Sequence, residues 1–247
     1  MLTAPGLSVI VSAIEEARRI FERMNSYAIY RITETIRIML FMVTAMLAFN
    51  IYPITAIMII LLALLNDLPI MTIAKDNTWL DPKPVRWDMR RVLSVSTILG
   101  TLGLVETFFL LYFVMEVMRL PHGVVQSIIF LKLCVAGQLT LLVARTKNPF
   151  WSKPHPAPIL AGALLFTQTI AACVVGFGVF VSAIPFKYIL GVWGYALAWV
   201  FVEDWAKRQV YRHLALKHPH HAKFMNVVTG SLHHPAASHH AQQRVVT

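Results

Sequence analysis

Charged residues are scarce in this sequence of 247 residues. Asp, Glu, Lys and Arg make up 14% of the chain, whereas 57% of its residues are hydrophobic. Soluble domains carry far more charge, so the composition excludes an ordinary soluble protein and indicates a chain that crosses a membrane several times. There are two cysteines, Cys134 and Cys173, both inside apolar runs. Their positions match no metal-binding spacing, and we interpret them as core residues.

Sequence motifs for nucleotide, metal and nucleophilic chemistry are also missing. The sequence contains no GxxxxGK[ST] phosphate loop, no HExxH, no CxxC and no serine elbow. We therefore expect no metal site, no cofactor and no catalytic residue in this chain. The net charge of +10 does not come from a basic patch, because the basic residues lie between the apolar runs. That placement is typical of membrane topology, so we expect no nucleic-acid partner.

The fold expected from the sequence is an all-α, polytopic membrane protein with six transmembrane helices. Residues 7–49 contain neither Pro nor Gly and predict one helix of about 43 residues, roughly 65 Å long. A helix of that length is about twice as long as a bilayer core is thick, and its first half is rich in charge. Residues 1–26 are therefore predicted to form a cytoplasmic stalk. The other spans are expected at about residues 53–73, 92–118, 124–144, 159–181 and 188–205.

The basic residues predict the orientation of these helices. Nearly all of them lie on the stalk, in loops 75–91 and 145–153, and after the sixth span, whereas the opposite side holds only Arg119 and Lys187. By the positive-inside rule both termini are cytoplasmic, and a lipid bilayer is the expected surrounding. The six-helix domain is predicted to cover residues 27–212. The histidine-rich tail, 213–247, is predicted to be disordered, although its histidines could also chelate metal.

A carboxylic acid and a proline stand close together in the second span, at Asp67 and Pro69. A carboxylate at membrane depth is costly and is by default a candidate functional group. Pro69 has no N–H, so the carbonyl of Leu65 is expected to lose its helical partner, and the helix turn is expected to break. Asn66 can donate a hydrogen bond to a nearby carboxylate or carbonyl. An acid beside a broken turn is the combination expected of an ion site, so Asp67 is the predicted ion-binding residue.

Arg37 in the first span is the predicted partner of Asp67. The short connection near Tyr52 makes the first two spans an antiparallel hairpin, and both residues then lie at about the same depth, roughly 20–24 Å from its turn. A nearby guanidinium favours the ionised acid, whereas burial alone favours the protonated one. A change in their separation would therefore bind or release a proton, although a permanent structural ion pair remains the alternative. Glu34, one turn before Arg37, is either its resting partner or a boundary residue.

Two further pairs of charges lie in the later spans. Glu106 in the third span and Lys132 in the fourth both fall in the outer half of the membrane, and we expect a structural ion pair, unless Lys132 snorkels to the surface. Glu203 and Asp204 stand near the end of the sixth span and are interpreted as interfacial. Gln138 is expected to bridge helices within the bundle.

The hairpin resembles the fifth and sixth membrane helices of the type III P-type ATPases, the proton-exporting pumps of plasma membranes, including prokaryotic ones. The resemblance covers about residues 2–210. It is strongest, and very specific, in the segment that contains Asp67, and it weakens in the sixth span and the tail. The matching segments are residues 2–10, 20–24, 35–38, 65–67 and 70–76.

The resemblance implies a role for each position. Asp67 would be the proton acceptor and donor, Arg37 the counter-charge that prevents back-flow, and the stalk the end of the phosphorylation domain. The chain would be the C-terminal membrane half of a pump that uses ATP and Mg²⁺. The DKTGT phosphorylation motif of the family is absent, so this chain alone should not hydrolyse ATP. A separate N-terminal half would carry the actuator, phosphorylation and nucleotide domains.

Three functions remain open from the sequence. The first is the ion-translocating half of a proton pump. The second is the corresponding half of a pump for another cation. Metal ions prefer several oxygen ligands, whereas the hairpin offers one acid opposed by an arginine, so this function fits the sequence less well. The third is a non-catalytic membrane subunit or a passive proton path.

Overall fold

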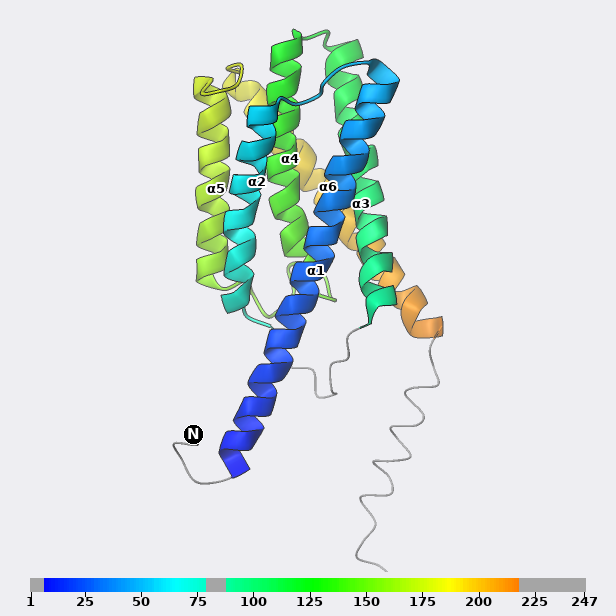
Figure 1. Ribbon diagram of the computed structural model, residues 1–247, viewed down its shortest axis with the longest axis vertical. Coiled ribbons are helices and arrows are strands. Elements are labelled where there is room, and N and C mark those ends of the chain that lie inside the picture. Colours follow the sequence, from blue (N-terminus) through cyan, green and yellow to red (C-terminus); the bar gives the residue numbers. More distant parts are fainter. Residues whose placement is uncertain (1–6, 79–87, 218–247) are drawn as a thin grey trace, which may run out of the picture. The chain divides into compact units, whose positions relative to one another are not determined.

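The computed structural model describes residues 7–78 and 88–217, and Figure 1 shows their arrangement. The described residues form helices and connecting segments, with no strand, so the expected all-α class is confirmed. Residues 1–6, 79–87 and 218–247 lie outside the described part; they include the start of the predicted stalk and most of the histidine-rich tail. All contacts reported below lie within the compact unit that ends at Gln209. The helices are α1 (Leu7–Phe49), α2 (Ala56–Thr72), α3 (Met89–Tyr112), α4 (His122–Ala144), α5 (Pro158–Phe177) and α6 (Phe186–Lys217).

Helix α1 is continuous over 43 residues, as the absence of Pro and Gly predicts. In Figure 1 its N-terminal half extends past the end of α2. Apolar side chains there, such as Ile10 and Ile14, are exposed. Two polar contacts tie this half to the loops: Glu22 pairs with Lys147 at 2.6 Å, and Arg23 donates to the carbonyl of Asp76 at 2.9 Å.

Helix α4 is the centre of the bundle. It packs against α1, α2, α3 and α5, and almost all of its side chains are buried. Figure 1 shows α2, α4 and α5 side by side, with α3 alongside α1. The core consists of aliphatic and aromatic residues from all six helices, including Phe41, Leu62, Leu111 and Phe130. A central helix that is apolar all round is expected only where neighbouring helices cover it on every side.

Five helices of the described part are long and apolar enough to cross a membrane: α1, α2, α3 with its π-helical extension, α4 and α5. The sixth helix, α6, has 32 residues but carries acids near its middle, so its membrane crossing remains a prediction. Glu203 and Asp204 are both buried, because other parts of the chain cover them, and α6 continues well past residue 205. Their interfacial depth in the membrane stays a prediction.

Two helix ends differ from the sequence prediction in an informative way. Helix α3 ends in a π-helical turn, Phe113–Val117, before the connection to α4. Helix α5 ends early, at Gly178, which adopts a left-handed conformation with φ of 71°. Glycine tolerates this conformation without steric cost and commonly ends helices in this way.

Candidate functional site: a buried charge cluster

Arg37 lies at the centre of a polar cluster inside the bundle. Its side chain is fully buried, at 0% exposure, and so is that of Glu34, one turn earlier on α1, at 5%. The guanidinium donates to Glu34, and its second nitrogen donates to the hydroxyl of Thr140 on α4 at 3.0 Å. The same nitrogen lies 3.9 Å from a carboxylate oxygen of Glu203 on α6. Three helices therefore meet at one guanidinium.

The cluster reaches α2 through Asn66. The side-chain amide of Asn66 donates to Glu34 at 3.0 Å, so the predicted hydrogen bond to a carboxylate is present. Glu34 is thus held by two donors, Asn66 and Arg37. Glu34 is therefore a buried partner of Arg37, the first of its two predicted roles.

Two glycines make room for the guanidinium. A Cβ atom added at Gly103 on α3 would stand 2.5 Å from Cδ of Arg37. One added at Gly137 on α4 would stand 3.0 Å from both Asn66 and Glu34. Real Cβ contacts are longer, so the lack of side chains at these two positions allows the helices to approach a buried arginine closely.

Asp67 does not contact Arg37, and the predicted pairing of these residues was wrong. Its carboxylate pairs with Arg31 at 2.6 Å, and both side chains are nearly half exposed, at 43% and 46%. Matched depth does not determine the direction in which a side chain points, because successive helical residues project about 100° apart. Asn66 takes the inward direction toward Glu34, so Asp67 points to the outer face of the α1–α2 pair.

Pro69 does not break α2, which continues through it to Thr72. The carbonyl of Leu65, which Pro69 leaves without a backbone donor, accepts a hydrogen bond from the side-chain amide of Gln138 at 3.3 Å. The carbonyl oxygen of the Gln138 side chain accepts in turn from Thr167 on α5 at 3.1 Å. Gln138 therefore bridges α2 and α5, as expected for a polar residue in a membrane bundle.

Glu106 on α3 and Lys132 on α4 form the contact predicted from the sequence. The ammonium lies 3.3 Å from the carboxylate, and both groups are buried. The ammonium also donates to the hydroxyl of Thr107 at 2.5 Å, which donates to the carbonyl of Gly103 at 2.6 Å. This pair interacts electrostatically with Arg37 and Glu203, so all the charges in the middle of the bundle belong to one cluster.

Sequence reasoning missed three members of the site: Arg31, Tyr30 and Glu203. The hydroxyl of Tyr30 is buried without a hydrogen-bond partner among the described residues, and it interacts electrostatically with both the Arg37–Glu34 and the Arg31–Asp67 pairs. A signal for Glu203 was available. A buried arginine has five N–H donors, which is more than one acid can satisfy, so a second acid on another helix was to be expected.

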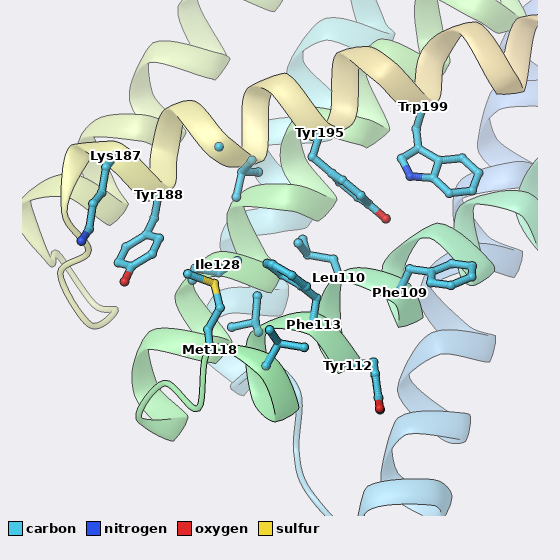
Figure 2. A pocket seen from close by; sticks show the side chains of 14 residues that line it. Phe109, Leu110, Tyr112, Phe113, Met118, Ile128, Lys187, Tyr188, Tyr195 and Trp199 are labelled. Carbon is cyan, nitrogen blue, oxygen red and sulfur yellow. The ribbon is translucent and has the colours of Figure 1, made fainter.

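An apolar groove of about 910 Å³ lies apart from this cluster, between α6 and the end of α3 (Figure 2). Lys187 is the one charged side chain among its lining residues, and its ammonium lies 5.0 Å from the centre of the Tyr188 ring. The groove suits hydrocarbon and not an ion. Aromatic side chains that line it include Phe109, Phe113, Tyr195 and Trp199.

Chemically, the central cluster suits the handling of protons better than the binding of a metal ion. The described residues contain no group of three or more His, Cys, Asp and Glu side chains arranged to hold a metal. Its acids are occupied by guanidinium, ammonium and amide donors, which compete with a cation for the carboxylate oxygens. Protons need no vacant coordination sphere and transfer between such groups over hydrogen-bond distances.

Comparison with known proteins gives close relatives for most of the chain, although no family model matches it. A provisionally named cation-transporting ATPase of Methanocaldococcus jannaschii is 45% identical over 216 residues, which is 87% of this chain and 27% of that protein. Plasma membrane ATPase 1 of Candida albicans is 35% identical and the plasma membrane ATPase of Kluyveromyces lactis 32% identical, each over 71% of this chain. The chain spans about a fifth to a quarter of the length of these relatives.

Proposed function

We propose that this chain, which belongs to the P-type ATPase family of cation-transporting membrane proteins, is the ion-translocating membrane part of a plasma-membrane proton pump. The observation that carries the proposal is the position of Asp67, which pairs with Arg31 on the outer face of the α1–α2 pair, one residue after Asn66, which binds the buried Arg37–Glu34 pair. Relatives that share up to 45% identity with the chain include plasma membrane ATPases. Their greater length is consistent with a pump of which this chain supplies the membrane half.

In this proposal Asp67 binds and releases the transported proton. Its carboxylate is nearly half exposed on the face of α2 where further membrane helices would pack, whereas the buried acids are enclosed by this chain. A proton path can therefore form between Asp67 and those helices. Tyr30 connects the Asp67–Arg31 pair to the buried cluster electrostatically. A shift of α1 along α2 would change the distance between Asp67 and Arg31, and with it the preference of the carboxylate for its proton.

Arg37 acts as a fixed counter-charge rather than as the direct partner of Asp67. Buried between Glu34 and Glu203, it keeps a positive charge near the path of the proton on α2. Two guanidinium groups on α1, those of Arg31 and Arg37, disfavour a metal cation in the same place, because each repels it and occupies a carboxylate that it would need. A pump for another cation is therefore the weaker alternative.

The remaining parts of the pump have to come from outside the described helices. An N-terminal half would bring the actuator, phosphorylation and nucleotide domains, together with the ATP and Mg²⁺ on which they act. The exposed apolar residues beside Asp67 on α2, Leu64, Leu68 and Met71, form the surface on which its membrane helices would pack. The stalk half of α1 would transmit movement from the phosphorylation domain, and both termini would be cytoplasmic.

The test is Asp67→Asn introduced into the gene in its native host. Inverted membrane vesicles from these cells should lose ATP-driven proton uptake, because an amide neither takes up nor releases a proton at neutral pH. Proton uptake is followed with a pH-sensitive dye, and the amount of chain in the membrane is measured by immunoblot.

The matched control is Asp88→Asn, the same chemical change at the N-cap of α3. Its side chain accepts a hydrogen bond from the backbone of Arg91, and asparagine caps helices equally well. This variant should pump normally. Undiminished uptake in Asp67→Asn membranes would contradict the proposal, and ATP-driven uptake of Na⁺ or Ca²⁺ in place of protons would favour a pump for another cation.

A further inference from the structure

The buried cluster contains one more acid than its cations can neutralise. Its carboxyl groups are Glu34, Glu106 and Glu203, and its cations are Arg37 and Lys132, all of them buried. The other buried charges of the described residues pair separately, Asp76 with Arg145 and Asp204 with Lys207. An uncompensated charge inside a bundle at membrane depth costs several kcal/mol, and an acid avoids this cost by holding a proton.

The hydrogen bonds at Thr140 indicate which acid this is. The hydroxyl of Thr140 lies 2.8 Å from the carbonyl of Ala136 and 2.9 Å from a carboxyl oxygen of Glu203, and it accepts from Arg37. A hydroxyl has one hydrogen and two lone pairs. If Glu203 is ionised, two acceptors compete for that one hydrogen. If Glu203 is protonated, it donates to Thr140, Thr140 donates to Ala136, and every contact has its own hydrogen.

The other two acids of the cluster each lie closer to a cation than Glu203 does. Glu34 receives hydrogen bonds from both Arg37 and Asn66. Glu106 makes no hydrogen bond among the described residues, but the ammonium of Lys132 lies 3.3 Å from its carboxylate. Glu203 has only a distant contact with the guanidinium, at 3.9 Å, and that oxygen has no hydrogen-bond partner among the described residues. Thr107 offers a comparison. Its hydroxyl accepts from Lys132 and donates to one carbonyl only, so its single hydrogen has a single acceptor, unlike that of Thr140 beside an ionised Glu203.

We propose that Glu203 is a second protonation site, a carboxylic acid that stays neutral at physiological pH and donates a hydrogen bond to Thr140. The charged groups around it are Arg37 and Glu34 on α1, Glu106 on α3 and Lys132 on α4. Its protonation follows from this chain's own contacts. Its place in transport rests on the proposed function.

The neutral state of Glu203 determines where Arg37 points. While Glu203 holds its proton, Glu34 is the stronger attraction and the guanidinium stays with it. Loss of the proton would create a carboxylate within 3.9 Å and draw the guanidinium toward α6, which would weaken its hold on Glu34 and, through Asn66, on α2. In a pump, Glu203 would therefore set the position of the counter-charge, while Asp67 carries the proton.

Infrared spectroscopy of the full chain in liposomes tests the assignment. At pH 7 an exposed glutamate is ionised, since its ordinary pKa is about 4.3. The chain should nevertheless show the C=O band of a protonated carboxyl, and Glu203→Gln should remove it. Glu116→Gln, the same change at an exposed glutamate, is the matched control and should leave the band intact.

The result that overturns the proposal is the absence of a protonated carboxyl band at pH 7, or a band that survives in Glu203→Gln. If Glu203→Gln does not fold, Thr140→Val decides, because loss of the hydrogen bond should move the band to higher frequency, and an unmoved band contradicts the assignment. These spectra need no ATP-driven transport. The proposed role of Asp67, tested by transport, and the proposed protonation of Glu203, tested by these spectra, can therefore be confirmed or contradicted independently.

Discussion

Arg37→Ala is expected to lower the free energy of unfolding by about 3–5 kcal/mol, enough to prevent folding of a marginally stable chain. The substitution removes the only donor group of α1 that reaches Thr140 and Glu203 among the described contacts, and it leaves Glu34 ionised in the core. The loss is measured by unfolding the purified chain in mixed detergent micelles. Its size reflects the buried charge that remains, more than the net value of the pair itself.

Arg19→Ala is the matched control for this prediction. The residue lies earlier on the same helix, in the predicted stalk, and also pairs with an acid, Glu16, but the pair is nearly half exposed. Exposed ion pairs contribute about 0–1 kcal/mol, so Arg19→Ala should be close to wild type in stability. Equal losses for the two arginines would show that burial does not distinguish them, and would contradict the expected cost of leaving Glu34 unpaired in the core.

Gly103→Ala should be destabilising by about 1–3 kcal/mol, although alanine is the better helix former. The added methyl group would stand 2.5 Å from Cδ of Arg37. The arginine cannot move aside freely, because Glu34 and Thr140 hold its far end. Loss of stability in detergent unfolding should therefore come with a weakened Arg37–Glu34 contact.

Gly162→Ala is the matched control, and it should change stability in the opposite direction. This glycine also lies within a helix, α5, and an added Cβ would meet nothing within 4 Å. Without crowding, alanine should stabilise the helix by about 0.5–1 kcal/mol. A destabilised Gly162→Ala would mean that alanine is unfavourable in this bundle even where it meets no atom, and the loss in Gly103→Ala could then not be attributed to contact with Arg37.

Long elements were predictable because their signals are local. The lack of Pro and Gly in residues 7–49 predicted α1 with both of its ends, and the charges between apolar runs located the remaining helices. The Glu106–Lys132 contact was predictable too, since two unlike charges at the same depth on adjacent helices are strongly drawn together. Apolar length and charge sign are properties of the sequence itself, so these inferences needed no knowledge of packing.

The partner of Asp67 was not predictable, because a sequence gives depth along a helix but not its rotation. Asn66 and Asp67 differ by one residue, and packing decides which of them faces Glu34. The burial of Glu203 was not predictable for a related reason: its charge marked the expected end of the span, whereas other parts of the chain cover that charge. In a buried polar network, a charged residue in the sequence no longer indicates an exposed position.

The bond between Gln138 and Leu65 has a consequence for how α2 can move. Pro69 has no N–H, so the helix lacks the backbone hydrogen bond to the carbonyl of Leu65. That carbonyl accepts one hydrogen bond from the neutral side chain of Gln138 instead. Such a bond contributes about 0.5–1.5 kcal/mol, which is comparable to thermal energy. The turn from Leu65 to Pro69, which contains Asp67, is therefore the part of α2 whose hydrogen bonding depends on another helix, because Gln138 on α4 supplies the donor that Pro69 lacks.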